Sequence, residues 1–192
     1  MSPSLTALDL SGAVDATTAL AATGCVSGAG DAVLCRALAT HGSVTRLDLR
    51  WNALGLVGAE ALSAVLRTNT ALTVVRVCGN RIGDAGLIAL VEALAENTTV
   101  RELTASHNGV GDTGGKALFR MLESNVTLRV VDVQKHAMTP AAGGVLARML
   151  RVNRSLERLD VSGRTYSWGD ATDAIVAAVA AAARPGFVFV DG

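Results

Sequence analysis

Histidine and cysteine are the residues of this 192-residue chain best suited to general-base catalysis, nucleophilic attack or metal binding. The three cysteines, at positions 25, 35 and 78, do not have the spacing of metal ligands. No acid or nucleophile recurs beside His136, and His41 and His107 are no better placed. The sequence therefore predicts no enzymatic activity, no metal site and no bound cofactor.

Paired glycines could form a phosphate-binding loop, but their spacing argues against one. A dinucleotide fingerprint needs three glycines at its own spacing in a strand-to-helix turn, with an acidic residue later in the chain. Here a two-glycine pattern returns every 28 residues, as Gly55 and Gly58, Gly83 and Gly86, and Gly111 and Gly114. These glycines are expected to serve tight turns ahead of successive helices.

The 28-residue period runs through most of the chain and predicts a repeating unit of strand, turn and helix. In residues 71–98, Leu72, Val75 and Val77 have the spacing of a short strand, while Leu87 and Leu90 begin a helical stripe. Apolar columns at the same positions recur in the neighbouring units, and stacking would join them into one core. The strands should therefore lie within residues 44–49, 72–77, 100–105, 128–133 and 156–161.

Two columns of asparagine follow the same period. Asn52, Asn80 and Asn108 come after the strands, where a buried amide could bond backbone groups of its own and the neighbouring unit, so we predict a structural asparagine ladder. His136 is expected to be a substituted position of this ladder. The second column closes the helices, where asparagine tolerates the left-handed conformation of a helix end. Its members are Asn69, Asn97, Asn125 and Asn153.

The repeats predict a single domain spanning residues 1–192. The approximate units are 4–42, 43–70, 71–98, 99–126, 127–154 and 155–183, followed by a final strand at 187–190. The first unit carries an 11-residue insertion within residues 11–25, since Leu10 lies 39 residues before Leu49. The last strand is expected to turn Val188 and Val190 toward the core.

Charge and hydropathy restrict the class of partner. The chain has 17 basic and 17 acidic residues, so no net field favours nucleic acid or an anionic membrane. The longest apolar run, residues 174–183, is about half as long as a membrane-spanning helix requires. The first residues lack the basic and apolar regions of a signal peptide. We therefore expect a cytoplasmic protein whose partners are proteins.

The segments 80–86, NRIGDAG, and 94–99, LAENTT, resemble the ribonuclease-inhibitor-like class of leucine-rich repeats. The resemblance covers nearly the whole chain. It implies an α/β fold, a right-handed leucine-rich-repeat solenoid or horseshoe with parallel strands on the concave face and helices on the convex face. The class includes ribonuclease inhibitor, the sensor arms of NOD-like receptors, the Ran GTPase-activating protein, and cytoskeletal and ciliary scaffolds, so it implies little about the partner.

Strand alternation indicates which side chains would meet a partner. With Leu47 and Leu49 turned inward, the residues between and beside them face the concave surface. Trp51 is unusual because small or polar residues occupy its column in the following units, and exposed tryptophan is enriched in binding hot spots. Packing of Trp51 against the insertion is the alternative. The candidate partner-binding residues are Arg46, Asp48, Arg50, Trp51, Arg76, Asp132, Arg158, Asp160, Phe187 and Phe189.

The ends of the solenoid are the second candidate for binding. Leu5 opens the first strand without a polar cap, and the final strand is followed only by Asp191 and Gly192. With its valines turned inward, that strand would present Phe187 and Phe189 on the concave face beside unpaired backbone groups.

The functional hypothesis is a non-catalytic interaction module or scaffold subunit, held within a larger cytoskeletal or ciliary assembly. A homodimer is the alternative assembly. Regulation of a small GTPase, as by the Ran activator, and ligand sensing, as by NOD-like receptors, are the alternative functions.

Overall fold

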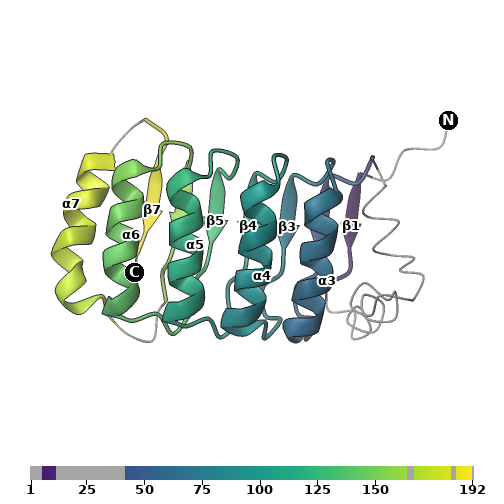
Figure 1. Ribbon diagram of the computed structural model, residues 1–192, viewed down its shortest axis with the longest axis horizontal. Helices are drawn as coiled ribbons and strands as arrows, with labels where there is room; N and C mark the ends of the chain where they lie inside the picture. Colours follow the sequence, from purple (N-terminus) through teal and green to yellow (C-terminus); the bar gives the residue numbers. More distant parts are fainter. Residues whose placement is uncertain (1–5, 12–41, 164–166, 183–184, 192) are drawn as a thin grey trace.

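The computed structural model describes residues 6–11, 42–163, 167–182 and 185–191. Its described strands form one parallel sheet in chain order, and Figure 1 shows the helices side by side in a single layer that covers one face of it. The strands are β1 (Ala7–Asp9), β2 (Arg46–Asp48), β3 (Val74–Arg76), β4 (Glu102–Thr104), β5 (Val130–Asp132), β6 (Arg158–Asp160) and β7 (Val188–Val190). The helices are α3 (Gly55–Thr68), α4 (Gly83–Glu96), α5 (Asp112–Ser124), α6 (Pro140–Val152) and α7 (Thr172–Ala182), with a 3₁₀ turn, η1, at Gly169–Ala171.

This architecture confirms the predicted α/β solenoid, and every predicted strand position is occupied. The register pairs residues 28 apart, such as Leu47 with Val75 and Val75 with Leu103. These central strand residues are fully buried between the sheet and the helices, where they meet Leu62 and Leu90 in one continuous core. The sheet face away from the helices, called the open face below, is the predicted concave surface.

The predicted asparagine ladder is confirmed. The Oδ1 atom of Asn80 accepts a hydrogen bond from the Asn52 N–H at 2.8 Å, and its Nδ2 donates to the carbonyls of Leu49 at 2.8 Å and Val77 at 2.9 Å. The side chain thus ties its own unit to the preceding one while remaining fully buried. Asn108 repeats these contacts one unit later.

His136 continues the ladder, as predicted. Its Nδ1 accepts a hydrogen bond from the Val110 N–H at 3.3 Å, and its Nε2 lies 3.1 Å from the Ala105 carbonyl oxygen. Because a backbone N–H only donates and a carbonyl only accepts, these partners select the neutral tautomer that carries its proton on Nε2. Burial lowers the pKa of His136 to about 4.

The second asparagine column ends the helices as predicted, but the expected left-handed conformation is wrong. Asn97 has φ −72° and ψ 130°, which is extended backbone. Its side chain supplies the reason, since Oδ1 accepts from the N–H groups of Thr99 and Val100 while Nδ2 donates to the Leu66 carbonyl. These asparagines therefore form a second ladder at the opposite end of the strands.

The predicted register of the last strand is also wrong. Phe189 pairs with Leu159, and Val188 pairs with Arg158, one residue away from the expected alignment. Phe187 and Phe189 accordingly pack against the core, and Val188 is exposed. The predicted insertion within 11–25 and the expected helix of the first unit lie outside the described residues, apart from Ser11.

Candidate binding site on the open face

The open face carries at least one charged side chain beside the central residue of each strand from β1 to β6. Arg46 and Arg158 are exposed before the buried leucines of β2 and β6, and Arg76 is half-buried after the buried valine of β3. The predicted alternation of buried and outward side chains is therefore confirmed for these three arginines. Their contribution to partner binding depends on which charges are already paired.

Two arginines of the N-terminal half are held by carboxylates of the same face. Arg50 donates through Nε to both oxygens of Asp48 at 2.9 Å, and its Nη2 lies 2.7 Å from Oδ2. Arg76 reaches across to β4 and donates to Oε1 of Glu102 from Nη2 at 3.0 Å. The charges of these two guanidinium groups are therefore already paired within the open face.

The aspartates after the strands have a structural task that the sequence pattern did not indicate. Oδ1 of Asp48, Asp132 and Asp160 accepts a hydrogen bond from the backbone N–H two residues later, at 3.1 Å in each case. Such turns stabilise the point where the strand ends. An aspartate at this position of the repeat therefore has a structural role, whether or not it also contacts a partner.

Asp160 was predicted to face a partner, but its side chain is buried. Its side chain is only 4% exposed, and it accepts hydrogen bonds from Arg158 Nη2 at 3.1 Å and from Ser162 Oγ at 2.7 Å. Burial raises the pKa of the nearby Asp132 carboxyl, and the charge of Asp160 raises it further. Asp160 therefore positions Arg158 from below the surface.

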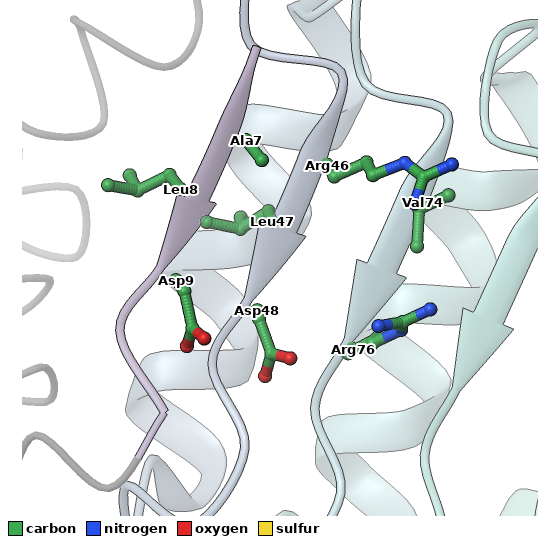
Figure 2. A pocket seen from close by; sticks show the side chains of 8 residues that line it. All are labelled: Ala7, Leu8, Asp9, Arg46, Leu47, Asp48, Val74 and Arg76. Carbon is green, nitrogen blue, oxygen red and sulfur yellow. The ribbon is translucent and has the colours of Figure 1, made fainter. Parts of the chain in front are cut away.

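Arg46 differs from the other arginines of the open face. Among the described residues, no hydrogen bond or ion pair engages its guanidinium group. It borders a hollow of about 200 Å³ whose wall includes Asp9, Asp48, Val74 and Arg76. Figure 2 shows Asp9 and Asp48 side by side on neighbouring strands, with Arg46 extending toward β3. The hollow thus offers both signs of charge within a small area.

Trp51 forms a flat aromatic surface at the edge of the open face. Its side chain is 58% exposed, and the indole lies over Gly79, where an added Cβ atom would collide with the ring. The indole also meets the imidazole of His107 at a centroid distance of 5.7 Å. Glycine in the next unit makes room for this arrangement, and most of the indole remains exposed.

His107 and Lys135 extend the same row and were not among the predicted binding residues. Both are exposed, and Lys135 crosses Gly163 in the way that Trp51 crosses Gly79. Trp51, His107 and Lys135 share a left-handed backbone, with φ between 56° and 60°. The sequence contained a signal for this row. Twice, a large residue in one unit is followed by glycine at the same position of the next unit, as Trp51 by Gly79 and Lys135 by Gly163.

His136 and Cys78 are buried side chains with hydrogen-bond partners inside the protein. His136 is 2% exposed and both of its ring nitrogens have backbone partners. Cys78 is buried, and its thiol donates to Thr104 Oγ1 at 3.3 Å. Within residues 6–11, 42–163, 167–182 and 185–191, no three His, Cys, Asp or Glu side chains gather to hold a metal ion.

Phe187 and Phe189, predicted on this face, do not belong to it. Their side chains pack against the end of the core, and Val188 takes the outward position next to Arg158. The predicted binding residues therefore divide into an N-terminal group around Arg46 and Trp51, a C-terminal pair of Arg158 and Asp132, and residues that serve the fold.

Comparison with known proteins identifies the repeat. Residues 43–63, 68–91 and 96–119 match a family model described as a leucine-rich repeat. A solved structure described as "Leiomodin-1 Actin-Binding Site 2 (ABS2)" aligns with a TM-score of 0.66 and 17% sequence identity, covering 79% of this chain and 88% of that one. At this identity the likeness concerns the fold alone. A search of curated proteins found no match.

The described helices were also compared with the length and hydropathy needed to span a bilayer. None of them meets both requirements.

Proposed function

We propose that this chain, which matches a leucine-rich repeat model in three stretches, acts as a non-catalytic interaction module that binds a protein partner across its open face. The observation that carries the proposal is the exposed indole of Trp51, which lies over Gly79 after the end of β2, on the face where Arg46 at the start of β2 borders the mixed-charge hollow. An aromatic anchor combined with an arginine is the usual composition of a binding hot spot.

Electrostatics favour a partner segment that carries both signs of charge. Asp9 and Asp48 line one side of the hollow, and Arg46 and Arg76 line the other. Hydrogen bonds from Ser11 lower the pKa of the Asp9 carboxyl, which favours its anionic form. A purely anionic ligand would meet these carboxylates, which supports a protein over nucleic acid.

The finer proposal is a scaffold role for a ribonuclease-inhibitor-like solenoid within a cytoplasmic, cytoskeletal assembly. Its support is the resemblance of the repeat sequences and the fold shared with a structure described as an actin-binding site of leiomodin-1. Actin is consequently the first purified partner to test.

The test compares three proteins in affinity capture followed by quantitative mass spectrometry. They are the wild type, the double variant Arg46→Ala with Trp51→Ala, and Arg120→Ala, which removes an exposed arginine from α5 on the helical face. We expect partners captured by the wild type and by Arg120→Ala to be lost from the double variant. Removing a hot spot costs about 2 kcal/mol or more, roughly a 30-fold loss of affinity.

Direct binding then identifies the partner. Actin co-sedimentation and titration with each purified candidate should repeat the order seen in capture. Equal capture by the double variant and the wild type, with unchanged melting temperatures, would overturn the open face as the binding surface.

A further inference from the structure

The C-terminal end of the sheet carries a hollow that the open-face proposal does not use. It measures about 240 Å³ and lies between α7 and β7, lined by Trp168, Ile175, Val176, Val179 and Phe189 together with Thr172 and Asp191. In the interior of the solenoid, the corresponding space is filled by the central strand residue of the next unit, such as Val75 beside Leu47. After β7, no further described strand fills it.

The outer edge of β7 has backbone groups directed away from β6. The Val188 N–H donates to the Glu157 carbonyl at 2.7 Å, and the Val190 carbonyl accepts from the Val161 N–H at 3.0 Å. In a parallel pair, alternate residues bond the same neighbour, so the N–H and C=O of Phe189 point to the opposite side. No described residue bonds them there. An unpaired edge of this kind is a template for another strand.

The surface around the hollow differs from the outer surface of the other helices. Val176 is 62% exposed, and alanines occupy the exposed positions 177, 180 and 181 of α7. The described charged residues at its N-terminal end, Asp170 and Asp173, are both acidic, and Asp191 lines the hollow itself. Apolar contact with flanking negative charge therefore favours an apolar segment that carries a basic residue.

We propose that this end binds an extended segment of a partner protein, which adds to β7 as an eighth strand. The partner residue opposite Phe189 places a large apolar side chain in the hollow, and its backbone pairs with the N–H and C=O of Phe189. A lysine or arginine at the end of the segment lies toward Asp173. This inference rests on the proposed role as an interaction module but uses a separate surface.

The probe is a fluorescein-labelled synthetic peptide in which leucines alternate with threonines and a lysine stands at each end. The control peptide has the same composition in scrambled order. We expect the alternating peptide to bind about tenfold or more tightly, since alternation is required to bury a leucine-sized side chain while the backbone pairs. Hydrogen exchange at the Phe189 amide should slow when the alternating peptide is bound.

Matched variants locate the site. Val176→Glu places a charge at the hollow and should weaken peptide binding about tenfold or more, whereas Val126→Glu, at a valine that is 72% exposed elsewhere, should leave it unchanged. Because both valines are exposed, neither change should unfold the protein. The variant Arg46→Ala with Trp51→Ala should bind the peptide like the wild type, which separates this proposal from the open-face proposal.

Equal binding of the two peptides, equal binding by Val176→Glu and the wild type, or unchanged exchange at Phe189 would overturn the proposal. Sedimentation provides the remaining test. If the wild type forms a dimer that Val176→Glu dissociates, and the peptide does not bind, the end is occupied by a second copy of the chain and strand addition by a partner is wrong.

Discussion

Acidification should destabilise this protein through the buried side chain of His136. Its Nδ1 accepts a hydrogen bond from Val110 N–H. Protonation of Nδ1 would replace this bond by a repulsive contact between two N–H groups in the core. The other ring nitrogen already faces the Ala105 carbonyl. The groups that face the ring offer no compensating contact, because Asp84 acts only through its charge and His107 opposes protonation.

The size of the effect follows from the pKa of His136, which is about 4 in the folded protein against 6.5 for the free side chain. A lowered folded-state pKa means that the unfolded chain binds the proton first, so the stability is present above pH 6.5 and is lost as the pH falls toward 4. The contribution of His136 to the free energy of unfolding should decrease by about 2 kcal/mol between pH 7 and pH 5, and by about 3 kcal/mol between pH 7 and pH 4.

The assay is urea unfolding followed by circular dichroism between pH 7 and pH 4.5, for the wild type and His136→Asn. Asparagine occupies the same position in other units, so the variant should keep the stability at pH 7 within about 1 kcal/mol and lose most of the difference between pH 7 and pH 5. His107→Asn removes the neighbouring histidine that lowers the pKa of His136, so this variant should keep the direction of the wild-type slope and make it slightly shallower. Equal acid sensitivity of His136→Asn and the wild type would refute the argument.

Three further substitutions test the core, the ladder and the aromatic surface. Leu90→Ala should cost about 2–5 kcal/mol in a thermal or urea melt because it leaves a cavity in the core, whereas Arg76→Ala should change stability by less than about 1 kcal/mol. Asn80→Ala should cost on the order of 3 kcal/mol or more, since it strands several buried backbone groups, and the same melts measure it. Gly79→Ala should displace the indole of Trp51, which NMR of its indole N–H would report, and unchanged shifts would contradict the described contact.

The strands and helices could be predicted because the apolar columns return with a constant period. Each unit buries the same positions against its neighbours, so Leu47, Val75 and Leu103 had to share a face whatever the details of the turns. The asparagine ladder followed from the same argument, since a buried amide at a turn needs backbone partners. His136 could be placed in the ladder for this reason, although its tautomer follows only from the hydrogen bonds to Val110 and Ala105.

The end of the sheet could not be predicted in the same way. Residues 187–190 alternate phenylalanine and valine, which are apolar in either register, so hydropathy does not decide which pair turns inward. The structure turns Phe189 toward Ile175 and Val179, where the larger ring covers more of the open end of the core. The 28-residue spacing of the earlier units did not decide the register either, because the last strand does not follow it: Phe189 pairs with Leu159.

Side-chain conformation limited the prediction of the binding site. Alternation places Asp48, Asp132 and Asp160 on the open face, but it does not show that their carboxylates turn back to the backbone N–H two residues later. The same holds for Arg50 and Arg76, whose charges are paired within the face. Arg46 stands out only once the structure shows that the charges of these other arginines are paired and that, among the described residues, its own is not.

The backbone at Trp51 provides a final test of whether this position is maintained for binding. Its φ of 60° is left-handed, and Gly79 and Gly163 occupy the same column with φ of 69° and 64°, so the fold is served by glycine there. A residue with a side chain costs about 1 kcal/mol in this conformation. Trp51→Gly should therefore be about 1 kcal/mol more stable than Trp51→Ala in urea unfolding, since both remove the indole and only alanine keeps the strain. Both variants should lose partner binding equally, because binding depends on the indole. Equal stability of the two would show that the left-handed conformation carries no cost, and retained binding by either would show that the indole is not the anchor.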